Sequence, residues 1–158
     1  MADIKACLST GKDDWETPED FFREQERKYG TFDLDACATK YNSKCLSYFS
    51  PEEDGLKQKW FGNVWCNPAY SKGQPDFWIR KAIAEVEAGN ARQVVMLLRC
   101  DTSTKRWHDL IVPNAADWDF VRGRIKFVGG DGGAPFASVV VVFRKGEKRI
   151  KREALLRP

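Results

Sequence analysis

The chain has 158 residues, enough for one domain of ordinary size, with 42% hydrophobic and 31% charged residues. No apolar run approaches the roughly 18 residues of a membrane-spanning helix. The early residues include acidic side chains and no apolar segment, so we expect no signal peptide. Membrane, secreted and fibrous classes are therefore excluded, and we expect one small domain without a separate recognition module.

Cysteine usage indicates the redox environment. There are 5 cysteines, an odd number, and none form a C-x-x-C pair. Such spacing argues against both a disulfide framework and a zinc cluster. We therefore expect the protein in a reducing cytoplasm. The cysteines are Cys7, Cys37, Cys45, Cys66 and Cys100.

Charge is distributed unevenly along the chain. Residues 1–62 carry a net charge of −4 and residues 63–158 one of +7, which together give the formal +3. A basic second half suits a polyanion such as DNA, because phosphates attract Lys and Arg side chains. A solvated basic face with a loose basic tail explains the same asymmetry equally well.

The order of predicted elements starts with a loose leader over residues 1–14. The first helix is expected to have Thr17 as N-cap and Pro18 at its first position, and to stop at Gly30. Further helices are expected at 76–88 and 102–110, with a partly helical turn at 51–60. Strands are expected at 31–34, 45–49, 62–66, 94–98, 117–121, 124–128 and 137–143.

This order of elements predicts the fold class. Strands alternate with helices early and follow one another later, which is typical of an α/β sheet, mostly parallel, with an antiparallel edge. Ligands of such sheets bind beyond the carboxyl ends of the strands. Asp35, Asn67 and Arg99 each follow or end a predicted strand, so we expect them along one edge.

The tetrapeptide Asn67-Pro68-Ala69-Tyr70 comes directly after a predicted strand. An amino group conjugated to a ring is a poor nucleophile because its lone pair is delocalised. The Asn67 side-chain oxygen and the Pro68 carbonyl, placed on its two N–H bonds, would turn that lone pair toward an electrophile. Tyr70 would stack on the ring. Alternatively, Asn-Pro only ends the strand in a turn.

Short segments before and after this tetrapeptide run in a fixed order along the chain. They are Trp15-Glu16-Thr17-Pro18, Phe32-Asp33-Leu34-Asp35-Ala36-Cys37-Ala38, Asn42, Lys44-Cys45, Tyr48-Phe49, Asp54-Gly55-Leu56, Trp60, Val64-Trp65-Cys66-Asn67-Pro68-Ala69-Tyr70-Ser71, Thr102-Ser103-Thr104, Trp107-His108 and Gly123-Arg124-Ile125. Each segment is weak alone. The ordered set, over roughly residues 15–143, resembles the phage-type DNA N6-adenine methyltransferase family, a branch of the S-adenosylmethionine-dependent amino-methyltransferases.

The resemblance implies a compact Rossmann-like methyltransferase domain over residues 15–143, between the leader and a basic tail at 144–158. It also implies transfer of a methyl group from S-adenosylmethionine to the exocyclic amino group of adenine in DNA, with no metal and no membrane partner. Adenine N6 is out of reach inside a duplex, so the target must be flipped out or single-stranded. The sequence predicts no oligomeric state and no target sequence.

Cofactor-binding positions carry over residue by residue. Thr17 and Pro18 are expected to hold the methionine end of the cofactor at a helix N-terminus. Asp35, at the end of the first strand and followed by Ala36 and Cys37, is expected to bind the cofactor's amino group or ribose. A solvated strand end is the alternative for Asp35.

A second cofactor segment lies further along the chain. The resemblance implies that Asp54 accepts a hydrogen bond from the cofactor's adenine amino group. A turn residue ahead of Gly55 is the alternative for Asp54. Asn67 is expected to contact the cofactor as well as the target amine.

Nucleic-acid contacts are expected from positions after Asn67, most of them basic. His108 is not required as a base, since the proton can leave N6 after the transfer. The expected contacts are Lys72, Arg99, Lys105, Arg106, Trp107, Arg122 and Arg124, and Lys126 is a further candidate.

The chain departs from the family pattern at Ala69, where relatives usually have a second proline. Proline fixes φ near −65°, so Ala69 leaves the loop freer. This difference predicts reduced precision and a lower rate, not loss of the chemistry. Two alternatives stay open: a methyltransferase acting on an RNA base or a glutamine amide, and a non-catalytic nucleic-acid-binding relative.

Overall fold

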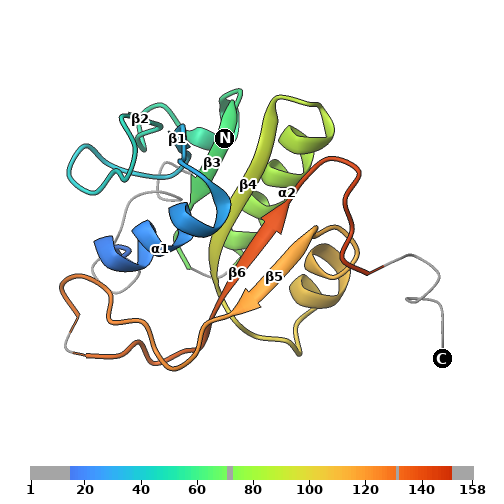
Figure 1. Cartoon of the computed structure of the whole chain (residues 1–158). Coiled ribbons are helices and arrows are strands. Elements are labelled where there is room, and N and C mark those ends of the chain that lie inside the picture. The colour runs from blue at the N-terminus through green and yellow to red at the C-terminus, as the bar shows by residue number, and fades with distance from the viewer. Residues whose placement is uncertain (1–14, 71–72, 131, 151–158) are drawn as a thin grey trace.

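The computed structural model describes residues 15–70, 73–130 and 132–150. The strands in this part of the chain form one sheet in the order β2-β1-β3-β4-β6-β5 (Figure 1). Neighbouring strands from β2 to β4 are parallel, whereas β6 runs antiparallel to both β4 and β5. The prediction of a mostly parallel α/β sheet with an antiparallel edge is confirmed. The strands are β1 (Leu34–Asp35), β2 (Ser47–Tyr48), β3 (Gly62–Cys66), β4 (Ala91–Arg99), β5 (Asp117–Phe120) and β6 (Ser138–Phe143).

Helices cover both faces of the sheet. Helix α1 (Glu19–Tyr29) lies on one face and α2 (Gln74–Glu87) on the other (Figure 1). Successive side chains of a strand point to opposite faces. On β4, Val94 and Met96 therefore join the core beneath α2, while Val95 and Leu97 join the core beneath α1. Two short helical turns complete the architecture, η2 (Gly55–Lys57) and η3 (Arg106–Ile111).

Two sequence predictions about local structure are wrong. Thr17 is not the N-cap of α1. The cap position is Pro18, whose side chain has no atom that could form a capping hydrogen bond, and the Thr17 hydroxyl bonds Asn67. Residues 124–128 are not a strand of the sheet. Ile125 and Phe127 are buried alternately as in a strand, but the segment pairs only through an isolated bridge between Val128 and Glu16.

Strand direction brings the predicted site residues to one edge. Asp35 pairs with Trp65, and Cys66 pairs with Met96, in parallel register. The carboxyl ends of β1, β3 and β4 therefore meet at the same edge of the sheet. Strand β5 is antiparallel to β6 and hence parallel to β4, so the chain after Phe120 also leaves from this edge.

The segment after β6 returns to the domain. The Arg149 N–H donates to the Ala115 carbonyl at 2.8 Å, and the Arg149 guanidinium lies 4.1 Å from the centre of the Trp118 ring. The predicted leader over residues 1–14 and the end of the predicted tail lie outside the described residues. No helix in the described segments is long and apolar enough to cross a membrane.

Candidate active site

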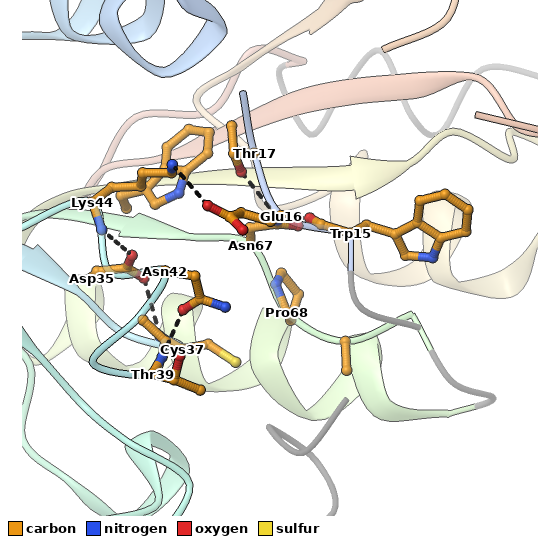
Figure 2. Close-up of a pocket in the computed structure, with 13 residues that line it drawn as sticks. Trp15, Glu16, Thr17, Asp35, Cys37, Thr39, Asn42, Lys44, Asn67 and Pro68 are labelled. Carbon is orange, nitrogen blue, oxygen red and sulfur yellow. Dashed lines mark hydrogen bonds and ion pairs between the residues drawn. The ribbon is translucent and has the colours of Figure 1, made fainter. Parts of the chain in front are cut away.

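A narrow pocket opens at the carboxyl edge of the sheet, where β1 and β3 end (Figure 2). Among the side chains that line the pocket, Asp35 and Lys44 lie on one side and Asn67 and Pro68 on the other. The Trp15 ring points away from the other labelled side chains. Thr17, Asp35, Cys37, Asn67 and Pro68 are predicted site residues that line this pocket. The other lining residues are Trp15, Glu16, Ala38, Thr39, Asn42, Lys44, Trp65 and Ala69.

The Asn67 side chain is held by three hydrogen bonds. Its Nδ2 donates to the Trp15 carbonyl at 2.6 Å and to the Thr17 hydroxyl at 3.0 Å. Its Oδ1 accepts from the Tyr70 hydroxyl at 2.9 Å. A primary amide can donate two and accept two hydrogen bonds. Both donors and one acceptor position of Asn67 are thus used by the protein, which leaves one lone pair of Oδ1 for another donor.

The Pro68 carbonyl is the second acceptor that the sequence predicts. Pro68 is buried and is the second residue after the end of β3. Among the described residues, none donates a hydrogen bond to its carbonyl oxygen. The tetrapeptide therefore offers two neighbouring acceptors, Asn67 Oδ1 and the Pro68 carbonyl, each with a lone pair to which no described residue donates.

Tyr70 lies folded inward against this tetrapeptide. Its hydroxyl lies within hydrogen-bonding distance of Asn67 Oδ1 and, at 3.0 Å, of the Leu97 carbonyl. The ring packs edge-on against Phe136, with the ring centres 5.4 Å apart. Burial raises the pKa of the Tyr70 phenol, so the hydroxyl stays protonated and remains a donor.

An aromatic cluster surrounds Tyr70 and was not predicted from the sequence. Phe136 also meets Trp15 edge-on at 5.1 Å, and Trp15 meets Phe127 at 5.4 Å. The Arg99 guanidinium lies 5.2 Å from the centre of the Phe136 ring. Phe127 and Phe136 flank the glycine-rich stretch between β5 and β6, and this clustering of aromatic and glycine residues is the one sequence signal that could have indicated them.

Asp35 organises the loop that follows β1. Its carboxylate accepts the Lys44 N–H at 3.0 Å and the Cys37 N–H at 3.4 Å. The side chain is 3% exposed, and burial raises its pKa to about 7, although both N–H bonds and the Lys44 charge oppose that shift. Asp35 is thus a buried carboxyl group that titrates near neutral pH, not a solvated strand end.

Two charged side chains of opposite sign line the pocket beside Asp35. Lys44 Nζ lies 3.6 Å from Glu16 and 3.5 Å from Glu19, and the Lys44 side chain is only 9% exposed. Glu16 and Lys44 both border the pocket. Their proximity was not predicted, because they come from segments on opposite sides of α1 and β1 in the sequence.

Asp54 is held in an unusual backbone conformation. Its φ is +56°, in the left-handed region, and Oδ1 accepts the Leu56 N–H at 3.1 Å. The other carboxylate oxygen, Oδ2, is buried without a hydrogen bond and lies 3.9 Å from Lys57 Nζ. Gly55 fixes this turn, because a Cβ there would lie 2.2 Å from the Ala36 carbonyl. Asp54 is therefore held close to the end of β1, outside the pocket around Asn67.

Comparisons with known proteins identify the family of this chain. The sequence profile of the family described as DNA N-6-adenine-methyltransferase (Dam) matches residues 6–151. The chain belongs to this family. Two relatives are both described as DNA N-6-adenine-methyltransferase. The one from Escherichia phage T1 is 37% identical, over 77% of this chain and 56% of its own length. The one from Haemophilus phage HP1 (strain HP1c1) is 38% identical, over 77% of this chain and 70% of its own length.

A comparison of structures gives a more distant likeness. The crystal structure of the 23S rRNA methyltransferase ErmE matches 89% of this chain and 55% of its own chain. The TM-score is 0.40 and the sequence identity is 13%. At these values the likeness supports no further conclusion.

The residues of this Dam-family chain that are predicted to contact nucleic acid differ in their exposure and in their partners. Arg99, Lys105, Arg122 and Arg124 are exposed, and Arg99, Arg122 and Arg124 lie at or beyond the carboxyl ends of strands. Arg106 forms an ion pair with Asp76 of α2. Trp107 is 7% exposed and packs against Trp118 in the core. Lys72 lies outside the described residues.

Proposed function

We propose that this chain is an adenine-specific DNA methyltransferase, which transfers the methyl group of S-adenosylmethionine to adenine N6. The observation that carries the proposal is the pair of open acceptors, Asn67 Oδ1 and the Pro68 carbonyl, at the carboxyl edge of the sheet. Membership of the Dam family supports adenine in DNA as the substrate. The chain spans about half the length of one phage relative and 70% of the other.

The two acceptors determine what the site can do with an amino group. Each accepts one N–H of the exocyclic amine, so the nitrogen is held with its lone pair turned out of the conjugated plane. Both acceptors are fixed before substrate arrives, and preorganised dipoles of this kind lower a barrier because they need not reorient during reaction. S-adenosylmethionine supplies an electrophilic sulfonium methyl group when bound. The surplus proton then leaves N6 to solvent.

The pocket residues fit the cofactor that the family implies. A zwitterionic amino-acid end needs partners of both signs, and Glu16 and Lys44 provide them within one pocket. Asp35 adds a buried carboxyl beside them. The Thr17 N–H, just ahead of α1, offers a donor to the carboxylate end, whereas Pro18 has no N–H and can only shape this turn.

The remainder of the cofactor site continues past the end of β1. Ala36 and Cys37 follow Asp35 there, and small side chains allow close approach of a ligand. The buried Oδ2 of Asp54 lacks a hydrogen-bond donor, as expected of an acceptor for the adenine amino group. We propose that Thr17, Pro18, Asp35, Ala36, Cys37, Asp54 and Asn67 together hold S-adenosylmethionine.

DNA binding is assigned to exposed basic side chains near this edge. Arg99, Lys105, Arg122 and Arg124 are proposed to contact phosphates, and Lys72 is retained as a prediction. Arg106 is held by its ion pair with Asp76 and Trp107 packs in the core, so contact of these two residues with DNA stays a prediction. Such contacts offset the few kcal/mol that flipping the target adenine costs, unless the strand is already single. We expect the enzyme to act in the cytoplasm.

The proposal is tested by incubating the protein with tritiated S-adenosylmethionine and, in separate reactions, unmethylated duplex DNA, RNA and protein. Label on DNA, lost in Asn67→Ala, supports it. Asn90→Ala is the matched control, because Asn90 lies in the turn between α2 and β4, away from the site. Label only on RNA or protein assigns the chain to another methyl acceptor, and cofactor inertness assigns it to a non-catalytic binder.

A further inference from the structure

The Thr17 hydroxyl forms a hydrogen bond with Asn67 of the tetrapeptide and does not cap α1, the helix that follows Thr17. Thr17 is 2% exposed, and its Oγ1 lies 3.0 Å from Asn67 Nδ2 (Figure 2). Helix α1 begins two residues later with no side-chain capping bond at its N-cap. The hydroxyl is therefore buried against the one amide whose orientation decides whether the tetrapeptide presents an acceptor.

The orientation of that amide matters because its two ends differ. The Trp15 carbonyl can only accept, so the nitrogen of Asn67 must face it. Turning the amide by 180° would set Oδ1 against the Trp15 carbonyl at 2.6 Å and would point N–H groups toward the target amine. Thr17 occupies the second N–H, so rotation away from the productive orientation breaks two hydrogen bonds instead of one.

The segment that supplies this frame is itself anchored. The Val128 N–H donates to the Glu16 carbonyl at 3.0 Å, and Trp15 packs against Phe127 and Phe136. Residues 15–17 are thus held between β3 and the long connection from β5 to β6. The frame around Asn67 is thus held by contacts with two other parts of the domain.

We infer that Thr17 is a positioning residue for methyl transfer, which acts through Asn67 by keeping Oδ1 turned toward the target amine. This inference rests on the proposed function and adds a role for the Thr17 side chain distinct from cofactor binding. Its main-chain N–H remains available to the cofactor. Loss of the hydroxyl should therefore affect the catalytic step and leave cofactor affinity unchanged.

The test compares Thr17→Val, which has nearly the same shape, with Thr17→Ser, which keeps the hydroxyl. With saturating cofactor and DNA, kcat of Thr17→Val should fall roughly 5- to 10-fold, the effect of one hydrogen bond. The Kd for S-adenosylmethionine, measured by equilibrium dialysis, should change less than about 2-fold, because the substitution removes no hydrogen bond to the cofactor. Thr17→Ser should restore kcat. Thr31→Val is the matched control, since Thr31 is exposed at the opposite end of β1.

A second measurement is independent of activity. The side-chain amide protons of Asn67, assigned in nitrogen-15 NMR spectra by their absence from Asn67→Ala, should shift and exchange faster in Thr17→Val. Thr17→Ala replaces Thr17→Val if the latter does not fold. A raised Kd with unchanged kcat would move the hydroxyl to the cofactor site, and unchanged amide signals would remove the positioning role. An inactive wild type whose amide signals still respond to Thr17→Val would contradict the proposed function and not this contact.

Discussion

The Tyr70 hydroxyl lies 3.0 Å from the Leu97 carbonyl and supplies the hydrogen-bond donor that β3 cannot. Along β4, Cys100 donates to Ala137 on the β6 side, so alternate residues, including Leu97, turn their main-chain groups toward β3. Continued parallel pairing would give the Leu97 carbonyl the N–H of residue 68. Pro68 has no N–H. The Tyr70 hydroxyl thus takes the place of the missing N–H at the end of the β3–β4 hydrogen-bond ladder. The same hydroxyl also lies within hydrogen-bonding distance of Asn67 Oδ1.

This contact predicts separable effects of the Tyr70 ring and hydroxyl. Tyr70→Phe keeps the ring that packs against Phe136 but removes the hydroxyl, whose one proton is shared between the Leu97 carbonyl and Asn67 Oδ1. We expect the free energy of unfolding to fall by about 1–2 kcal/mol and kcat to fall several-fold. Tyr70→Ala removes the ring as well, so its loss of kcat should be much larger. Urea unfolding and steady-state methyl transfer measure the two effects.

Tyr48→Phe serves as the control, because Tyr48 lies on the edge strand β2 and makes no contact with the tetrapeptide. It should leave kcat unchanged. Equal stability and equal kcat in Tyr70→Phe and the wild type would show that the hydroxyl has no role in the site.

At Ala69 we expect a substitution to maintain or raise kcat, in contrast to the losses expected at Tyr70. Among the described residues none accepts a hydrogen bond from the Ala69 N–H, so proline at this position removes no observed bond. Ala69→Pro should stiffen the loop next to the Pro68 carbonyl and maintain or raise kcat. Methyl transfer at saturating substrates measures it. A clear fall in rate would show that the freedom of Ala69 is needed.

Asp35 predicts a pH dependence of stability. Its pKa is raised to about 7 in the folded protein, above the value near 3.9 of an unfolded chain. Between these values the folded state binds the extra proton, so the Asp35 contribution is greatest in acid and is lost as pH rises toward 7. The free energy of unfolding of Asp35→Asn should therefore lack this decline. Urea unfolding between pH 5 and pH 8 compares the two proteins.

The matched control for this comparison is Asp33→Asn, an exposed aspartate that directly precedes β1. It should follow the pH profile of the wild type. Parallel profiles of wild type and Asp35→Asn would mean that Asp35 is ionised throughout this range. If Asp35 binds the cationic cofactor, affinity should also rise with pH through about 7, because only the ionised carboxylate attracts it.

The basic side chains at the carboxyl edge predict how DNA binding responds to salt. Arg122→Gln and Arg124→Gln should each weaken binding and lower the slope of log affinity against log salt by about 1. Arg92→Gln should not, since Arg92 is exposed near the start of β4, at the opposite edge. Fluorescence anisotropy with a labelled duplex measures the slopes. Identical slopes for all three variants would place the DNA elsewhere.

The sequence predicted best where pattern and local chemistry agree. The bounds of β3 were predicted from the residues before Asn67-Pro68, because proline ends a ladder at a definite position. The apolar run of β4 and the carboxyl-edge location of Asp35, Asn67 and Arg99 follow from burial and strand direction. Residues 124–128 alternate as a strand does, yet their buried side chains face an aromatic cluster instead of a neighbouring strand.

Contacts between distant segments could not be predicted. Thr17 and Pro18 have the composition of a helix start, but whether the hydroxyl caps α1 or bonds Asn67 depends on where β3 ends in space. The closeness of Glu16 to Lys44, and of Tyr70 to Leu97, likewise requires the folded sheet. A side chain whose sequence context predicts a local role, such as a helix cap, can therefore contact the site instead once the strands are paired.

The central claim is that Asn67 and Pro68 present two acceptors to the amino group of adenine. The most direct test digests DNA to nucleosides after reaction with S-adenosylmethionine and identifies the methylated product by mass spectrometry. We expect N6-methyl-2′-deoxyadenosine from the wild type and none from Asn67→Ala, with cofactor binding by the variant retained in part. Methylated cytosine, or N6-methyladenine formed equally well by Asn67→Ala, would contradict it.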